Sequence, residues 1–374
     1  MNAVTPSGDI GRVNDPRPDH MRHYMSGDSA AFMEGFAVAC ALLLHYSHRD
    51  ALLDTIQRTG GLIYKSVIRP GAEPISDAAQ IQEELGENNP FITLAPSFGE
   101  AIGRGQGLRS ALSKANPSAI EEVTEPHARG QILLAAIFDA FFSIYVHRSQ
   151  DLFRIYRAGG GKVDSIDLPY VLAQSLADEA NQIATRVFNM CVRALDYCPP
   201  VGFQFGDFLR ACVTADHQCD PVDGWGVREA LIQAFRGRGI RPRGTPFFSE
   251  DGLRWPIFDT SSLSAPGPEF TGLLEPEPES QQCNLNSVRS FIQANAEGIG
   301  LRPSVDFTLF PLEISNWAVP GEPPSTIVTT QVLQVRGERQ KRKVQTDESA
   351  PPDETGIALV FEGTGKLRHV IRGD

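Results

Sequence analysis

Glu34 is the residue whose surroundings say most about chemistry, because it lies inside an apolar segment. Residues 30–44 are AAFMEGFAVACALLL, which predicts a helix that is buried on every side. A carboxylate in such a place is costly unless a positive group meets it. We therefore expect Glu34 to be a metal ligand, one half of a buried ion pair, or a protonated acid.

Three histidines are relevant to the metal alternative. His20 and His23 precede Glu34 at a spacing of three, which allows both to bind one ion, but no glutamate lies between them to activate a water. His127 opens a second apolar segment within EPHARG, residues 125–130. The HExxH pattern, which supplies two zinc-binding histidines and a general base, occurs nowhere in the sequence.

The segment around Glu34 resembles the helix that carries the third zinc ligand in thermolysin-like zinc metallopeptidases, the gluzincins. The resemblance implies that Glu34 is a zinc ligand and that His127 stabilises the oxyanion of a tetrahedral intermediate. It also implies that Arg129 assists His127, or is a salt-bridge partner at the start of that helix. Tyr24 resembles the family's transition-state tyrosine, at a slightly different spacing.

The chain keeps only part of the family pattern. Met33 replaces the polar residue before the ligand, and Val38 replaces an aspartate one helical turn after it. Further likeness to uncharacterised bacterial members of the family lies in three later segments: residues 193–200, 205–211 and 225–240. The resemblance covers residues 25–240 and, weakly, the C-terminal hairpin.

Structural roles are the alternatives for these residues. Glu34 can pair with Arg129 or another arginine across a helix interface. His127 can be a helix N-terminal histidine that is hydrogen-bonded to a carbonyl. A group of charged residues is expected to form ion pairs that hold the helices together: Asp196, Asp207 and Asp216 with Arg193 and Arg210.

Periodicity divides the chain into four parts. Residues 1–27 are expected to be a flexible lead-in, residues 28–240 a helical lobe, residues 241–285 a Pro- and Ser-rich linker, and residues 286–374 a small α+β unit. The predicted helices span 28–45, 49–59, 126–158, 169–194, 205–215, 226–236 and 286–296. The predicted strands span 306–310, 325–333, 357–361 and 367–371, the last two as a hairpin. The fold class is thus mainly α, and the resemblance implies a lobe like the C-terminal domain of thermolysin-like peptidases.

Composition narrows the class of partner and the compartment. A net charge of −12 argues against nucleic acid or an anionic membrane as the main partner. The polar N-terminus has no apolar signal-peptide core, and the six cysteines form no CxxC pair, which favours a cytoplasmic protein with free thiols.

The function that these features predict is that of a truncated or degenerate zinc metallopeptidase-like protein without peptidase activity of its own. Zinc, the family's cofactor, is expected to be absent or weakly bound. One alternative is a non-enzymatic module that binds a peptide or protein at the residual cleft. Another is a metallopeptidase completed by an HExxH helix from an upstream or partner chain. Half a cleft leaves apolar surface exposed, which favours a partner or a homo-oligomer.

Overall fold

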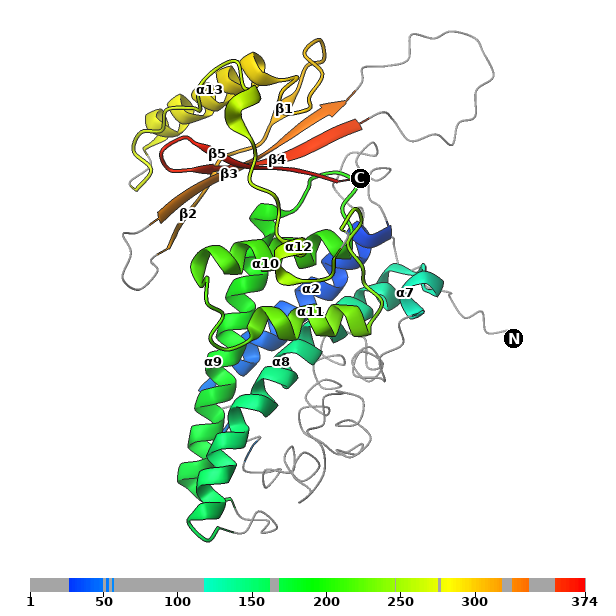
Figure 1. Ribbon diagram of the computed structural model, residues 1–374, viewed down its shortest axis with the longest axis vertical. Helices are drawn as coiled ribbons and strands as arrows, with labels where there is room; N and C mark the ends of the chain where they lie inside the picture. Colours follow the sequence, from blue (N-terminus) through cyan, green and yellow to red (C-terminus); the bar gives the residue numbers. More distant parts are fainter. Residues whose placement is uncertain are drawn as a thin grey trace, which may run out of the picture.

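The computed structural model describes residues 27–49, 52–53, 56, 118–161, 168–245, 247–274, 277–317, 325–335 and 354–373. The chain is mostly helical and has a small antiparallel sheet toward its C-terminus. The helices form the larger part, and the sheet lies at one end of it with helix α13 on its outer side (Figure 1). The prediction of a mainly helical chain with a small α+β unit is confirmed at this level.

The helices follow the predicted order along the chain. Those of the larger part are α2 (Gly27–Tyr46), α7 (Ala119–Glu122), α8 (Pro126–Ala158), α9 (Tyr170–Ala194), α10 (Phe205–Cys219), α11 (Val227–Gly237) and α12 (Glu250–Leu253). Short 3-10 turns span Leu195–Tyr197 and Thr260–Ser262. The helix predicted over residues 49–59 lies largely outside the described residues.

The start of α8 is fixed by its first residues. Pro126 occupies the first turn, where its missing N–H is no loss. The Glu125 carboxylate caps the helix by accepting hydrogen bonds from the backbone N–H groups of His127, at 3.1 Å, and Ala128, at 2.7 Å. This cap sets the position of the His127 side chain on the first turn.

Helices α2 and α8 pack backbone against backbone where Gly35 meets Gly130. A Cβ atom added to Gly130 would lie 2.6 Å from the Ala31 carbonyl oxygen, and one added to Gly35 would overlap the Gly130 carbonyl. No larger side chain fits at either position without moving a helix. The close approach brings Glu34, which precedes Gly35, next to His127, which lies three positions before Gly130.

The prediction that α2 is buried on every side is wrong. Met33 is 62% exposed, Ala37 is exposed, and the Glu34 side chain is 37% exposed. The buried residues recur at three and four positions, as expected for a helix with one face on the core: Ala31, Phe32, Gly35, Ala39, Leu42, Leu43 and Tyr46. Small and apolar residues on the outer face made the segment look uniformly buried in the sequence.

Helices α2 and α8 are each long and apolar enough to cross a membrane by length and composition alone. This is weak evidence, because the core helix of a soluble protein passes the same test. Most of the apolar window of α8 is buried inside the protein, whereas less than half of the α2 window is.

The sheet is antiparallel and is built around β3 (Ser325–Val335). On one side β3 pairs with β1 (Thr308–Leu309) and β2 (Glu313–Trp317), and on the other with β4 (Glu354–Glu362), which forms the predicted hairpin with β5 (Leu367–Arg372). Strand β2 was not predicted from the sequence. Helix α13 (Pro278–Asn295) starts earlier than predicted, at a proline in its first turn.

Both faces of the sheet are buried. Ile327, Ala358, Val360 and Ile371 belong to the same core as the helices of the larger part. Val328, Ile357, Leu359 and Phe361 form a second core with Val288, Phe291 and Ile292 of α13. Residues 241–285, expected to be a linker, contribute the buried side chains of Leu253 and Trp255.

His369 lies at the contact between the sheet and the helices. Its Nδ1 is 2.8 Å from the carbonyl oxygen of Pro256, and its Nε2 is 3.2 Å from the side-chain nitrogen of Gln218. The carbonyl requires a donor and the amide an acceptor, so the ring is neutral with its proton on Nδ1. Burial lowers the pKa of His369 to about 4.

Gly35→Ala is expected to destabilise the chain by about 1–3 kcal/mol, because the new methyl group overlaps the Gly130 backbone. The measurement is urea-induced unfolding. Gly237→Ala is the matched control, since a Cβ there meets no atom within 4 Å. The control should leave stability unchanged or raise it by up to about 1 kcal/mol. Equal effects of the two changes would rule out the close crossing.

Acid is expected to weaken the chain through His369. The folded pKa of about 4 lies below the ordinary value of 6.5, so the unfolded state binds the proton first. The contribution is present above pH 6.5 and is lost as the pH falls toward 4, by up to about 3 kcal/mol. Unfolding free energies of wild type and His369→Gln, measured between pH 7 and pH 4, should differ in slope; parallel curves would contradict this assignment.

Candidate functional site

Glu34 and His127 lie side by side, on two helices 93 positions apart in sequence (127 − 34). The Oε2 atom of Glu34 is 3.3 Å from Nδ1 of His127, and the two side chains are 37% and 47% exposed. The residues predicted to share a site are thus brought together at the α2–α8 crossing. The pair is open to solvent, so the premise of a carboxylate embedded in apolar surroundings does not hold.

Arg129 does not pair with Glu34, which removes one of the predicted alternatives. Its guanidinium binds the Asp28 carboxylate and donates to the carbonyl oxygens of Ile120 and Val123. The other Asp28 oxygen accepts a hydrogen bond, at 3.0 Å, from the backbone N–H of Phe205, the first residue of α10. Arg129 and Asp28 together fasten the beginnings of α2, α8 and α10 to one another.

The other predicted site residues lie outside the described part of the chain. These are Tyr24, His20 and His23. Among the residues that the structure describes, no three or more His, Cys, Asp or Glu side chains are grouped as metal ligands. Glu34 and His127 therefore offer two donors of the kind that zinc uses, where a catalytic zinc takes three from the protein.

The predicted ion pairs have different partners in the structure. Asp216 pairs with Arg228 and Arg186, not with Arg193 or Arg210. Asp207 instead accepts from the backbone N–H of Gln204 at 2.9 Å and closes a capping box on α10. Asp196 accepts from the Ser315 hydroxyl at 3.1 Å and so contacts β2. Arg210 stacks over the ring of Trp255, 3.7 Å from its centroid.

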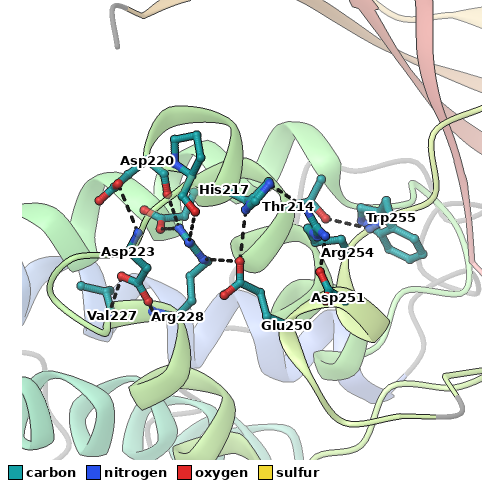
Figure 2. Close-up of polar contacts among 12 residues, drawn as sticks. Thr214, His217, Asp220, Asp223, Val227, Arg228, Glu250, Asp251, Arg254 and Trp255 are labelled. Carbon is teal, nitrogen blue, oxygen red and sulfur yellow. Dashed lines mark hydrogen bonds and ion pairs between the residues drawn. The ribbon is translucent and has the colours of Figure 1, made fainter. Parts of the chain in front are cut away.

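A buried arginine organises the second polar cluster, which joins α10, α11 and α12 (Figure 2). Arg228 is 1% exposed, and its Nη1 donates to the Asp216 carboxylate at 2.7 Å and to the Asp220 carbonyl at 2.5 Å. Its Nε lies 2.9 Å from Oε1 of Glu250. Burial raises the pKa of Asp216, and Arg186 and Arg228 oppose this shift. Arg228 belongs to no motif that would mark it as buried in the sequence.

His217 extends this cluster toward α12 (Figure 2). Its Nδ1 is 3.1 Å from Oε1 of Glu250, and its Nε2 is 2.6 Å from Nη1 of Arg254. Because arginine can only donate, Nε2 must accept and Nδ1 carries the proton. Glu250 is thus shared by Arg228 and His217, and Asp251 binds the other end of Arg254. The contacts of His217 with Glu250 and Arg254 join α10 to α12 and to the residue that follows it.

The Arg228 network is expected to be essential for stability. Arg228→Met leaves the buried Asp216 carboxylate without its nearest cation and should cost about 3–5 kcal/mol in urea unfolding. Adding Asp216→Asn should recover part of the loss, because the unpaired charge is removed. Arg154→Met, which breaks an exposed pair with Asp151, is the control and should change stability by less than about 1 kcal/mol. A similar small effect at both arginines would show that Arg228 is not structural.

No family model, curated protein or solved structure matches the chain. What the site can do is therefore inferred from its own residues and contacts.

Proposed function

We propose that the chain is a metallopeptidase-like protein in which Glu34 and His127 form one wall of a former zinc site. The observation that carries the proposal is the 3.3 Å contact between the Glu34 carboxylate and the His127 imidazole at the crossing of α2 and α8. The two residues were singled out from separate sequence segments, and their adjacency is what a shared metal pocket requires. The likeness to thermolysin-like peptidases is part of this proposal.

The proposed protein does not hydrolyse peptides on its own. Hydrolysis of the gluzincin type needs a general base beside two histidine ligands, and the sequence contains no HExxH. Two donors without that helix bind zinc weakly, since each missing ligand removes a metal–protein bond. The two side chains contact each other directly, with Oε2 of Glu34 3.3 Å from Nδ1 of His127.

A second candidate function is the binding of a peptide or protein at the same face. Met33 is 62% exposed and follows directly on the buried Phe32, while Ala37 lies one turn further along the exposed face. Exposed methionine side chains are enriched at protein-binding surfaces. Both candidates use the α2–α8 face, and they differ in whether metal affinity survives there.

Zinc titration of the purified chain by calorimetry tests the proposal. We expect weak binding that Glu34→Gln and His127→Ala each reduce about tenfold, since each removes one of two donors. His147→Ala is the matched control, because His147 is an exposed histidine on the same helix and should leave binding unchanged. Equal losses in all three variants would mean scattered surface binding and would contradict the proposal.

A peptidase assay of the zinc-loaded chain tests the proposed lack of activity. We expect no cleavage of an unstructured protein substrate above the zinc-only background. Cleavage that disappears with Glu34→Gln would refute the degenerate site and assign an active one to this chain.

A further inference from the structure

A groove of about 650 Å³ lies between α8, α9 and the turn that enters α11. The groove is bordered by Arg148 and Asp151 of α8, Glu179 of α9, Trp225 of the turn, and Glu229 of α11. This volume is in the range of sites that bind small molecules. The proposed zinc-site residues are not part of it.

The indole of Trp225 is held in a fixed position. The guanidinium carbon of Arg148 lies 4.0 Å from its ring centroid, and that of Arg186 lies 5.5 Å away. Arg186 is in turn bound to Asp220 at 2.5 Å, in the same turn. Asp223 accepts hydrogen bonds from the first N–H groups of α11 and fixes the end of this turn. The aromatic wall is therefore preorganised before any ligand arrives.

The charge of the groove favours a cation. Arg148 is neutralised by Glu179, which it contacts through two hydrogen bonds of 2.7 and 3.2 Å. The remaining carboxylates, Asp151 and Glu229, belong to different helices and are exposed. Asp151 is paired with Arg154 across the surface of α8, and Glu229 accepts from Gln233 at 2.5 Å. These surface contacts are weak competitors for a ligand that reaches both acids.

We propose that this groove binds an ammonium or guanidinium group carried on an apolar stem. The carboxylates of Asp151 and Glu229 receive the charged ends, and the stem lies along Trp225, Leu152 and Ala230, which line the same groove. The net charge of −12 on the chain adds a long-range attraction for such ligands. An anion is disfavoured because Arg148, the arginine in the lining, is already paired with Glu179.

Calorimetric titration of the full chain tests the inference, with spermidine and arginine amide as the probes. We expect at least one probe to bind with one-to-one stoichiometry. Glu229→Gln and Asp151→Asn should each weaken binding about threefold, and together about tenfold, since each removes one charge that the ligand contacts. Binding of spermidine alone identifies a free polyamine as the source of the cation. Binding of arginine amide alone identifies a basic side chain.

The matched control is Glu279→Gln, which removes an exposed carboxylate on α13 and so causes the same change in net charge. It should leave binding unchanged. Thermal melting of each variant checks that the fold is intact. The inference is overturned if neither probe binds the wild-type chain. It is also overturned if Glu279→Gln weakens binding as much as the groove variants do, because the attraction would then come from overall charge.

Discussion

The crossing of α2 over α8 is the constraint on which the site depends. Gly35 and Gly130 allow the two backbones to touch, and the Asp28–Arg129 ion pair closes the same interface at the beginnings of the helices. These two contacts fix the backbones that carry Glu34 and His127. The ion pair also recruits the first N–H of α10. His127 lies on the first turn of α8 and Glu34 on the second turn of α2. Backbone packing between the two helices therefore positions the site, and the site residues themselves do not.

Much of the fold could be predicted from the sequence because the signals are local. The long helices have apolar residues at three- and four-residue spacing, and Pro126 and Gly159 mark the limits of α8. The hairpin of β4 and β5 was visible from two alternating runs around a glycine turn. Strand β2 was missed because EISNW is short and lacks clear alternation, and its pairing with β3 depends on a contact between separate segments.

The site was predictable in part, for a related reason. Residue type and spacing pointed to Glu34 and His127, whereas the exposure of Glu34 depends on which face of α2 meets the core. Composition could not decide that, since alanine is compatible with either face.

The partners of the charged residues were harder still to predict from the sequence. Arg129 binds Asp28 and Arg228 binds Asp216, and in both cases the partner is fixed by how helices cross and not by sequence distance. Asp216 was expected in an ion pair, but nothing in the sequence marked Arg228 as its partner, because this arginine becomes buried only where α10, α11 and α12 assemble.

The central strands of the sheet are covered on both faces, so the chain cannot be divided into two fragments without exposing one of these faces. Alternate residues of β3 and β4 enter two different interiors, with Val360 turned to the helices and Leu359 to α13. A fragment that stops near residue 285 would leave the helical interior without its lid of Ile327, Ala358 and Ile371. The fragment that begins near residue 286 would expose the apolar face of the sheet that packs on the helices. Boundaries drawn from the proline-rich composition of residues 241–285 would thus expose apolar surface on both fragments, because the sheet shares its two faces between both cores.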